Sequence, residues 1–142
     1  MANAMFDPGR EGFLDGTIDF DTATIKAALV RSYTFSAAHK FVSDLTGAGG
    51  SLVATSAALA SKTVASGVAD AADVTFSAVA SGAAITGIAV FQSSAVTGGA
   101  DVAATAQRLV AWIDTATGLP VTPNGGDISV AWDNGANKIF KL

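Results

Sequence analysis

Short stretches of alternating apolar and polar residues, separated by turn-forming residues, recur along most of this sequence. Residues 108–114 have the two-residue period of a β-strand, and one face of that strand would carry Leu109, Ala111 and Ile113. Residues 85–92 form a more continuous apolar run, which predicts a central strand covered on both faces. Turn residues are dense at residues 115–126, so the chain is expected to reverse direction there.

The same reasoning applied to the whole chain predicts about eight short strands. They lie at residues 25–31, 51–56, 59–64, 74–80, 85–92, 108–114, 128–132 and 138–142. One or two helical turns are expected at residues 8–15 and 38–45. With 142 residues, the chain has the length of one domain. The predicted fold is therefore mainly β, a single-domain β-sandwich or partly closed barrel.

Two parts of the chain are expected to differ in role: an N-terminal arm at residues 1–20 and a β domain at residues 21–142. Glycines interrupt the arm, while large apolar residues supply anchors that a flexible polar tail would not need. The predicted partner-binding residues are Phe6, Phe13, Leu14 and Phe20. The alternative use of these residues is local packing on the core of the domain itself.

The C-terminal residues 127–142 carry a second pattern, in which Asp133-Asn134-Gly135 separates two apolar runs. This tripeptide is typical of a β-hairpin turn, because its residues tolerate positive φ at little cost. The pattern predicts a terminal hairpin that buries Trp132. Both Trp132 and Trp112 are interpreted as core anchors, and exposed tryptophans that bind a sugar or a partner are the alternative.

Charge and composition exclude several classes of protein. Eight Lys and Arg residues stand against twelve Asp and Glu residues, and they form no basic patch, so a nucleic-acid partner is not expected. The longest uncharged stretch, residues 74–100, is interrupted by Ser, Thr, Gln and Gly, which argues against a membrane span. The start of the chain does not resemble a secretory signal, and there is no cysteine for disulfide or thiolate chemistry. These features fit synthesis in a reducing cytosol.

No constellation of residues predicts an enzyme. His39 is the single histidine, and no nucleophile motif accompanies it. The carboxylate pairs Asp19/Asp21 and Asp70/Asp73 are interpreted as turn and cap residues. A weak Ca²⁺ site at one such pair is the alternative, although EF-hand spacing is absent. No catalytic residue, cofactor or metal site is therefore predicted.

Several segments resemble a family of small virion proteins encoded among the structural genes of tailed bacteriophages. The two longest are residues 3–20 (NAMFDPGREGFLDGTIDF) and residues 108–142 (RLVAWIDTATGLPVTPNGGDISVAWDNGANKIFKL). Shorter matches are residues 25–30, 51–56 and 67–77, so the resemblance covers most of the chain. The loops near Gly47 and Gly98 depart from it. The family has no catalytic motif, so no functional residue is transferred.

The resemblance implies a virion component, and in particular a capsid decoration (cement) protein. Such a protein binds the assembled shell and holds neighbouring capsomers together. The implied partner is the major capsid protein, with symmetric copies or a homo-oligomer of this chain on the capsid surface of the virion. A tail, head-fibre or adhesin component is one alternative, and a free carbohydrate-binding β-module is another.

Overall fold

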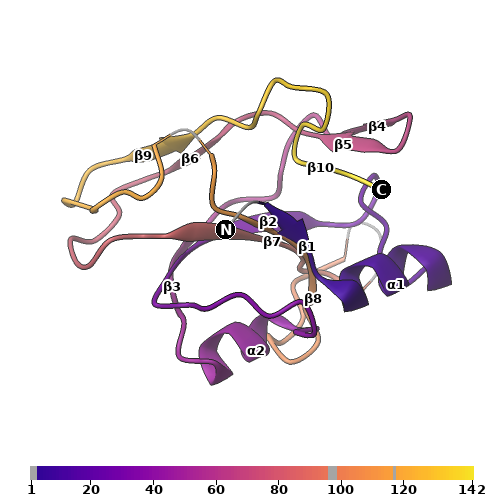
Figure 1. The fold of residues 1–142 in the computed structure, drawn as a ribbon, viewed down its shortest axis with the longest axis horizontal. Coiled ribbons are helices and arrows are strands. Elements are labelled where there is room, and N and C mark those ends of the chain that lie inside the picture. The colour runs from indigo at the N-terminus through magenta and orange to yellow at the C-terminus, as the bar shows by residue number, and fades with distance from the viewer. Residues whose placement is uncertain (1–2, 96–98, 117) are drawn as a thin grey trace.

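A five-stranded antiparallel sheet forms the centre of the molecule, in the order β1-β8-β7-β2-β3 (Figure 1). In the computed structural model, which describes residues 3–95, 99–116 and 118–142, the chain folds around this sheet. Its strands are β1 (Ala4–Met5), β2 (Ile25–Arg31), β3 (Ser51–Thr55), β7 (Gly87–Gln92) and β8 (Arg108–Ile113). The middle strands β2, β7 and β8 are largely buried because both faces of the sheet are covered. The prediction of a central strand at residues 85–92 is confirmed.

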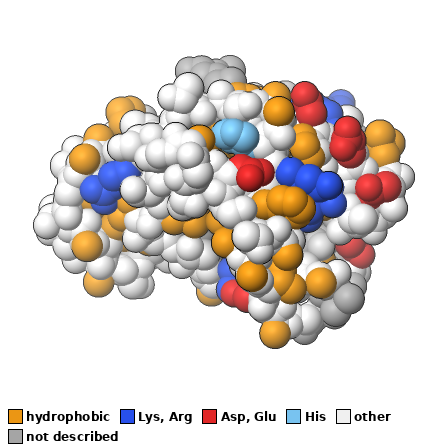
Figure 2. Space-filling model, turned by 90° about the horizontal axis from the view of Figure 1, so that it is seen from below, with side chains coloured by type: hydrophobic (Ala, Val, Ile, Leu, Met, Phe, Trp, Pro, Cys, Tyr) orange, Lys and Arg blue, Asp and Glu red, His pale blue; other side chains and the backbone are white. Residues whose placement is uncertain are grey.

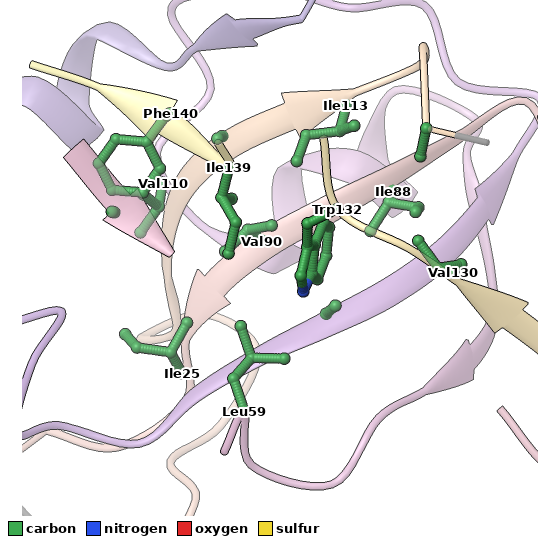
Figure 3. Packing of buried hydrophobic residues seen from close by; sticks show 14 of the residues in the cluster. Ile25, Leu59, Ile88, Val90, Val110, Ile113, Val130, Trp132, Ile139 and Phe140 are labelled. Carbon is green, nitrogen blue, oxygen red and sulfur yellow. The ribbon is translucent and has the colours of Figure 1, made fainter. Parts of the chain in front are cut away.

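Two smaller sheets cover one face of the central sheet (Figure 1). One has the order β10-β5-β4 and consists of β4 (Thr63–Ala65), β5 (Val68–Asp70) and β10 (Phe140–Lys141). The other pairs β6 (Val74–Phe76) with β9 (Ile128–Val130). Figure 3 shows the interior between these layers, where Trp132 lies among Ile88, Val90 and Ile139. Trp132 is buried, as the sequence predicted.

The other face of the central sheet is covered by α2 (Val42–Gly47) and the chain that leads into it. Here Val30, Leu45 and Trp112 are buried together. The alternation along β2 explains the two layers, because Ile25, Ala27 and Leu29 belong to the first core and Ala28 and Val30 to the second. Trp112 is therefore a core residue, as predicted.

These layers confirm the prediction of a mainly β, sandwich-like single domain. The part of the chain that the structure describes contains ten strands and two helices, compared with about eight strands expected. The two additional strands are short: β1 has two residues and β5 has three. Such short strands are held by pairing to neighbouring strands, which local alternation does not reveal.

The helix α1 (Asp7–Asp15) matches the helical turn expected at residues 8–15. Pro8 lies in its first turn, and Gly16 ends it with a φ of 79°, a conformation that glycine adopts without strain. Asp7 does not cap the helix; it is the first helical residue and pairs with Arg10 at 2.9 Å. The helix lies against β8, and a Cβ atom at Gly9 would be 2.8 Å from the carbonyl oxygen of Leu109.

The prediction of a separate N-terminal arm is wrong. β1 pairs with β8, so residues 4–5 form the edge of the central sheet. Phe6 is fully buried and Phe20 is 4% exposed. The apolar residues of this segment pack on the core of the domain, which was the alternative, because burial of their surface is more favourable than exposure to water. The described residues from Asn3 to Phe20 therefore belong to the domain.

The predicted C-terminal hairpin is also wrong. The chain does turn after Trp132, but β9 pairs with β6, and β10 pairs with β5 in a different sheet. The backbone N–H of Trp132 donates to Asp73 at 3.0 Å, and its indole N–H donates to the carbonyl of Ala72, also at 3.0 Å. These bonds hold the end of β9 beside residues 72–73 rather than beside the last strand. A turn signature specifies a reversal of the chain, not the partner of each strand.

Candidate partner-binding surface

His39 belongs to an aromatic cluster beside α2. Its Nδ1 atom lies 2.7 Å from the hydroxyl of Tyr33, and the Tyr33 ring meets Trp112 with centroids 4.9 Å apart. Burial raises the pKa of Tyr33. Figure 2 shows the histidine on the face seen from below, with an acidic side chain beside it. The geometry holds the loop between β2 and α2 in place; the partner of His39 is a tyrosine rather than a nucleophile with an orienting acid.

Three of the carboxylates that the sequence singled out accept hydrogen bonds from backbone N–H groups. Asp19 accepts hydrogen bonds from the hydroxyl and the backbone N–H of Thr22, which lower its pKa. Asp73 accepts the backbone N–H of Trp132, and Asp70 accepts that of Ala71. The interpretation as a turn residue is confirmed for Asp19, whereas Asp73 binds the end of a distant strand and Asp70, in β5, also pairs with Lys138 at 3.7 Å. Within the described residues, no group of three or more His, Cys, Asp or Glu side chains could hold a metal ion.

The four predicted partner-binding residues separate into two places. Phe6 lies on the α2 side of the central sheet, where its ring is 5.1 Å from that of Phe35. Phe13 and Phe20 lie on the opposite side and both contact the ring of Phe140, with centroid distances of 5.6 and 5.4 Å. Leu14 is 89% exposed. The structure therefore brings Phe13 and Phe20 together, leaves Leu14 in solvent beside them, and removes Phe6 from any surface.

Phe13 and Phe20 line a surface hollow of about 450 Å³, which we call the apolar groove. One wall comes from the end of α1 and the loop after it, through Phe13, Ile18 and Phe20. The other wall comes from the three-stranded sheet, where the register places Val64 opposite Ala69 and Ala69 opposite Phe140. Residues opposite one another in a sheet project to the same face, so these three form one row. Figure 1 shows this sheet beside α1.

The rim of the groove carries apolar side chains that are open to solvent. Among the described residues, the large apolar side chains that are exposed are Leu14, Val64 and Leu142. Val64 and Leu142 line the groove, and Leu14 follows Phe13, which also lines it. Exposed apolar residues gathered at one place are typical of a binding surface, whereas scattered ones need no explanation.

Acidic residues complete the rim. Asp19 and Asp21 line the groove, and its lining contains no Lys or Arg. Lys62, the residue before β4, lies close to these carboxylates: its Nζ atom donates to the carbonyl of Ala23 and lies 5.9 Å from the centre of the Phe20 ring. Burial lowers the pKa of Lys62, while the two carboxylates oppose this effect. The ammonium group of Lys62 beside the two carboxylates therefore already donates a hydrogen bond to a backbone carbonyl.

Sequence reasoning did not identify Val64, Ala69, Phe140 or Leu142 as groove residues. Their contribution depends on the pairing of β4, β5 and β10, which no local pattern specifies. One sequence feature could have indicated the groove: Val64 is an isolated large apolar residue among Ser, Thr, Ala and Lys, in a segment without a clear buried face.

No helix in the described ranges is long and apolar enough to cross a membrane. Comparison of the chain with protein-family models, curated proteins and solved structures finds no match.

Proposed function

We propose that the protein is a structural component of a tailed-bacteriophage virion, and specifically a decoration protein that binds the assembled capsid. Its partner is the major capsid protein, and many symmetric copies stabilise contacts between neighbouring capsomers on the outer surface of the shell. The protein is made in the host cytoplasm before it joins the particle. The resemblance of residues 3–20 and 108–142 to small phage virion proteins suggests the setting.

The observation that carries a binding role is the apolar groove with its exposed rim residues Val64 and Leu142. A side chain that is apolar and open to water gains free energy when a partner covers it, at roughly 25 cal/mol for each Å² removed from water. Many of the other exposed residues are Gly, Ala, Ser and Thr, which lose little conformational entropy when a partner orders them. Both features favour a protein that works by docking.

The carbohydrate-binding alternative is less well supported, because both tryptophans are buried. Trp112 is 3% exposed and Trp132 is 4% exposed, so neither offers a ring face on which a sugar could stack. A tail, head-fibre or adhesin component is distinguished from a decoration protein by its location in the particle.

The test begins with a phage that encodes this protein. The gene is deleted, capsids that lack the protein are prepared, and the purified protein is then added to them. We expect the protein to sediment with the capsids, and cryo-electron microscopy to show density repeated over the capsid lattice. Leu142→Asp, at an exposed position in the groove, should weaken this binding. Thr105→Asp introduces the same charge at an exposed position outside the groove and should bind normally. Density only at the tail would overturn the decoration role.

A further inference from the structure

We propose that the apolar groove accepts an extended, apolar segment of a partner protein that carries Lys or Arg at its ends, and that this segment adds as a strand to the free edge of β4. The inference rests on the proposed function only in assigning the segment to a shell protein. The chemistry of the groove itself can be tested without a shell.

The first step concerns the backbone of β4, the outer strand of the sheet β10-β5-β4. β4 and β5 are joined by Ser66 and Gly67, with φ values of 53° and 77°, a two-residue hairpin of the primed type. In such a hairpin, the residues that flank the turn exchange hydrogen bonds, and the next pair does not. Val64 and Ala69 form this next pair, so their N–H and C=O groups point away from each other.

The contacts of Ala69 support this geometry. The carbonyl of Ala69 accepts a hydrogen bond from the backbone N–H of Ile139 at 3.1 Å, so the backbone polar groups of Ala69 point toward β10. The N–H and C=O of Val64 therefore face the open edge of β4. An unpaired donor and acceptor on one residue is the arrangement to which an added strand binds.

The second step concerns the side chains. Val64 is 55% exposed and begins the row that continues through Ala69 to Phe140 in the wall of the groove. A strand that pairs with Val64 would place one of its side chains beside Val64 on the face of that row. The natural occupant of that position is apolar, because the groove beneath is lined by Phe13, Ile18 and Phe20.

The third step concerns charge and decides between a second copy and a different partner. Asp19 and Asp21 lie on the rim of the groove. Two copies that docked groove to groove would bring these carboxylates together, at an electrostatic cost. A partner segment with Lys or Arg at its ends would instead pair with them. Charge complementarity therefore favours a cationic segment from another protein.

The test measures the binding of two labelled synthetic peptides by fluorescence anisotropy. Both alternate valine and threonine; one has lysine at each end and the other has glutamate at each end. We expect the lysine peptide to bind roughly fivefold more tightly, which is the effect that one exposed ion pair can supply. Asp21→Lys, at a residue exposed to solvent, should reverse this preference. Equal binding of the two peptides, or no binding, would overturn the proposal.

Val64→Pro tests the strand addition itself. Proline removes the N–H that faces the open edge but no hydrogen bond within the sheet, so the fold should be retained. We expect the lysine peptide to bind about tenfold more weakly, because one backbone hydrogen bond is lost and the ring obstructs the added strand. Val64→Thr keeps the N–H and should bind within a few-fold of the original protein. Unchanged binding by Val64→Pro would overturn strand addition.

Two further outcomes separate this proposal from its alternatives. A concentration-dependent dimer in sedimentation velocity that Leu142→Asp abolishes would assign the groove to a second copy and overturn the proposal. Peptide binding without capsid binding would leave the groove inference intact and contradict the proposed shell role. Capsid binding that survives Val64→Pro, while peptide binding is lost, would place the shell contact elsewhere and overturn the assignment of the segment to a shell protein.

Discussion

The rings of Phe20 and Phe140 meet edge to face, with their centroids 5.4 Å apart. This contact joins a loop near the start of the chain to the last strand of the domain. The ring of Phe13 adds a second contact to Phe140, at 5.6 Å. The N-terminal residues and β10 therefore depend on each other for burial, and together they form the base of the apolar groove.

Removal of residues 1–20 should consequently unfold the protein. The deletion removes β1 from the central sheet and takes the buried side chains of Phe6, Ile18 and Phe20 out of the core. Losing one such aromatic residue costs about 3–5 kcal/mol, so losing several exceeds the total stability of a typical domain. Far-ultraviolet circular dichroism and urea titration would report this loss. Leu14→Ala is the control and should change stability by less than about 0.5 kcal/mol, since Leu14 is 89% exposed. A truncated chain that unfolds cooperatively at an unchanged midpoint would contradict the assignment.

Trp132→Ala should lower the free energy of unfolding by about 3–5 kcal/mol. The indole fills the space between the central sheet and β9, and it also donates to the carbonyl of Ala72 at 3.0 Å. Trp132→Phe separates the two contributions, because it retains an aromatic ring but leaves that carbonyl without its donor. The melting temperature of Trp132→Phe should lie between those of the original protein and Trp132→Ala. An unchanged melting temperature for Trp132→Ala would show that the residue is not part of the core.

The sequence predicted local features correctly, but its prediction of strand pairing at the C-terminus was wrong. Residues 85–92 and 108–114 are recognisable as strands, because burial on one or both faces of a strand determines the spacing of its apolar residues. The partner of β9 could not be predicted, because Asp133-Asn134-Gly135 specifies a turn whichever strand follows. The apolar groove depends on a row across three strands, which becomes visible only once their register is known.

Acid should destabilise the protein, in part through Asp44. The backbone N–H of Phe41, and then that of Lys40, donates to this carboxylate and lowers its pKa below the ordinary value of 3.8. Between the lowered pKa and that value, the unfolded chain binds more protons than the folded protein, so the free energy of unfolding falls as the pH falls. The contribution is fully present above the unfolded pKa and is lost as pH falls through the folded pKa.

Urea titrations at neutral pH and at about pH 3 would measure this effect. Asp44→Ala should cost about 1 kcal/mol at neutral pH, as expected for a carboxylate that binds the N-terminus of α2. It should also make the loss of stability on acidification smaller than in the original protein. If the variant lost the same amount on acidification, Asp44 would not contribute to the pH dependence.

Gly87→Ala should destabilise the protein by about 1–3 kcal/mol, the usual cost of overpacking a core. A Cβ atom at this position would lie 2.1 Å from Cζ2 of Trp112, and the same indole also meets the ring of Tyr33, with centroids 4.9 Å apart. The indole would therefore have to shift, at a cost to its contact with Tyr33. Gly47→Ala is the matched control: a Cβ there meets nothing within 4 Å, and the position is helical, so it should be neutral or slightly stabilising.

The clash can be separated from a general intolerance of alanine at residue 87 by a double-mutant cycle, measured by urea titration. Trp112→Phe removes the part of the indole that a new methyl group would meet, at the cost of leaving a cavity. In this background, Gly87→Ala should cost less than it does in the original protein, because its methyl group then occupies space that the indole has left. A coupling energy of about 1 kcal/mol or more, in the favourable direction, is expected for side chains in contact. Strictly additive effects would mean that Gly87 is required for its backbone and not for the fit of Trp112.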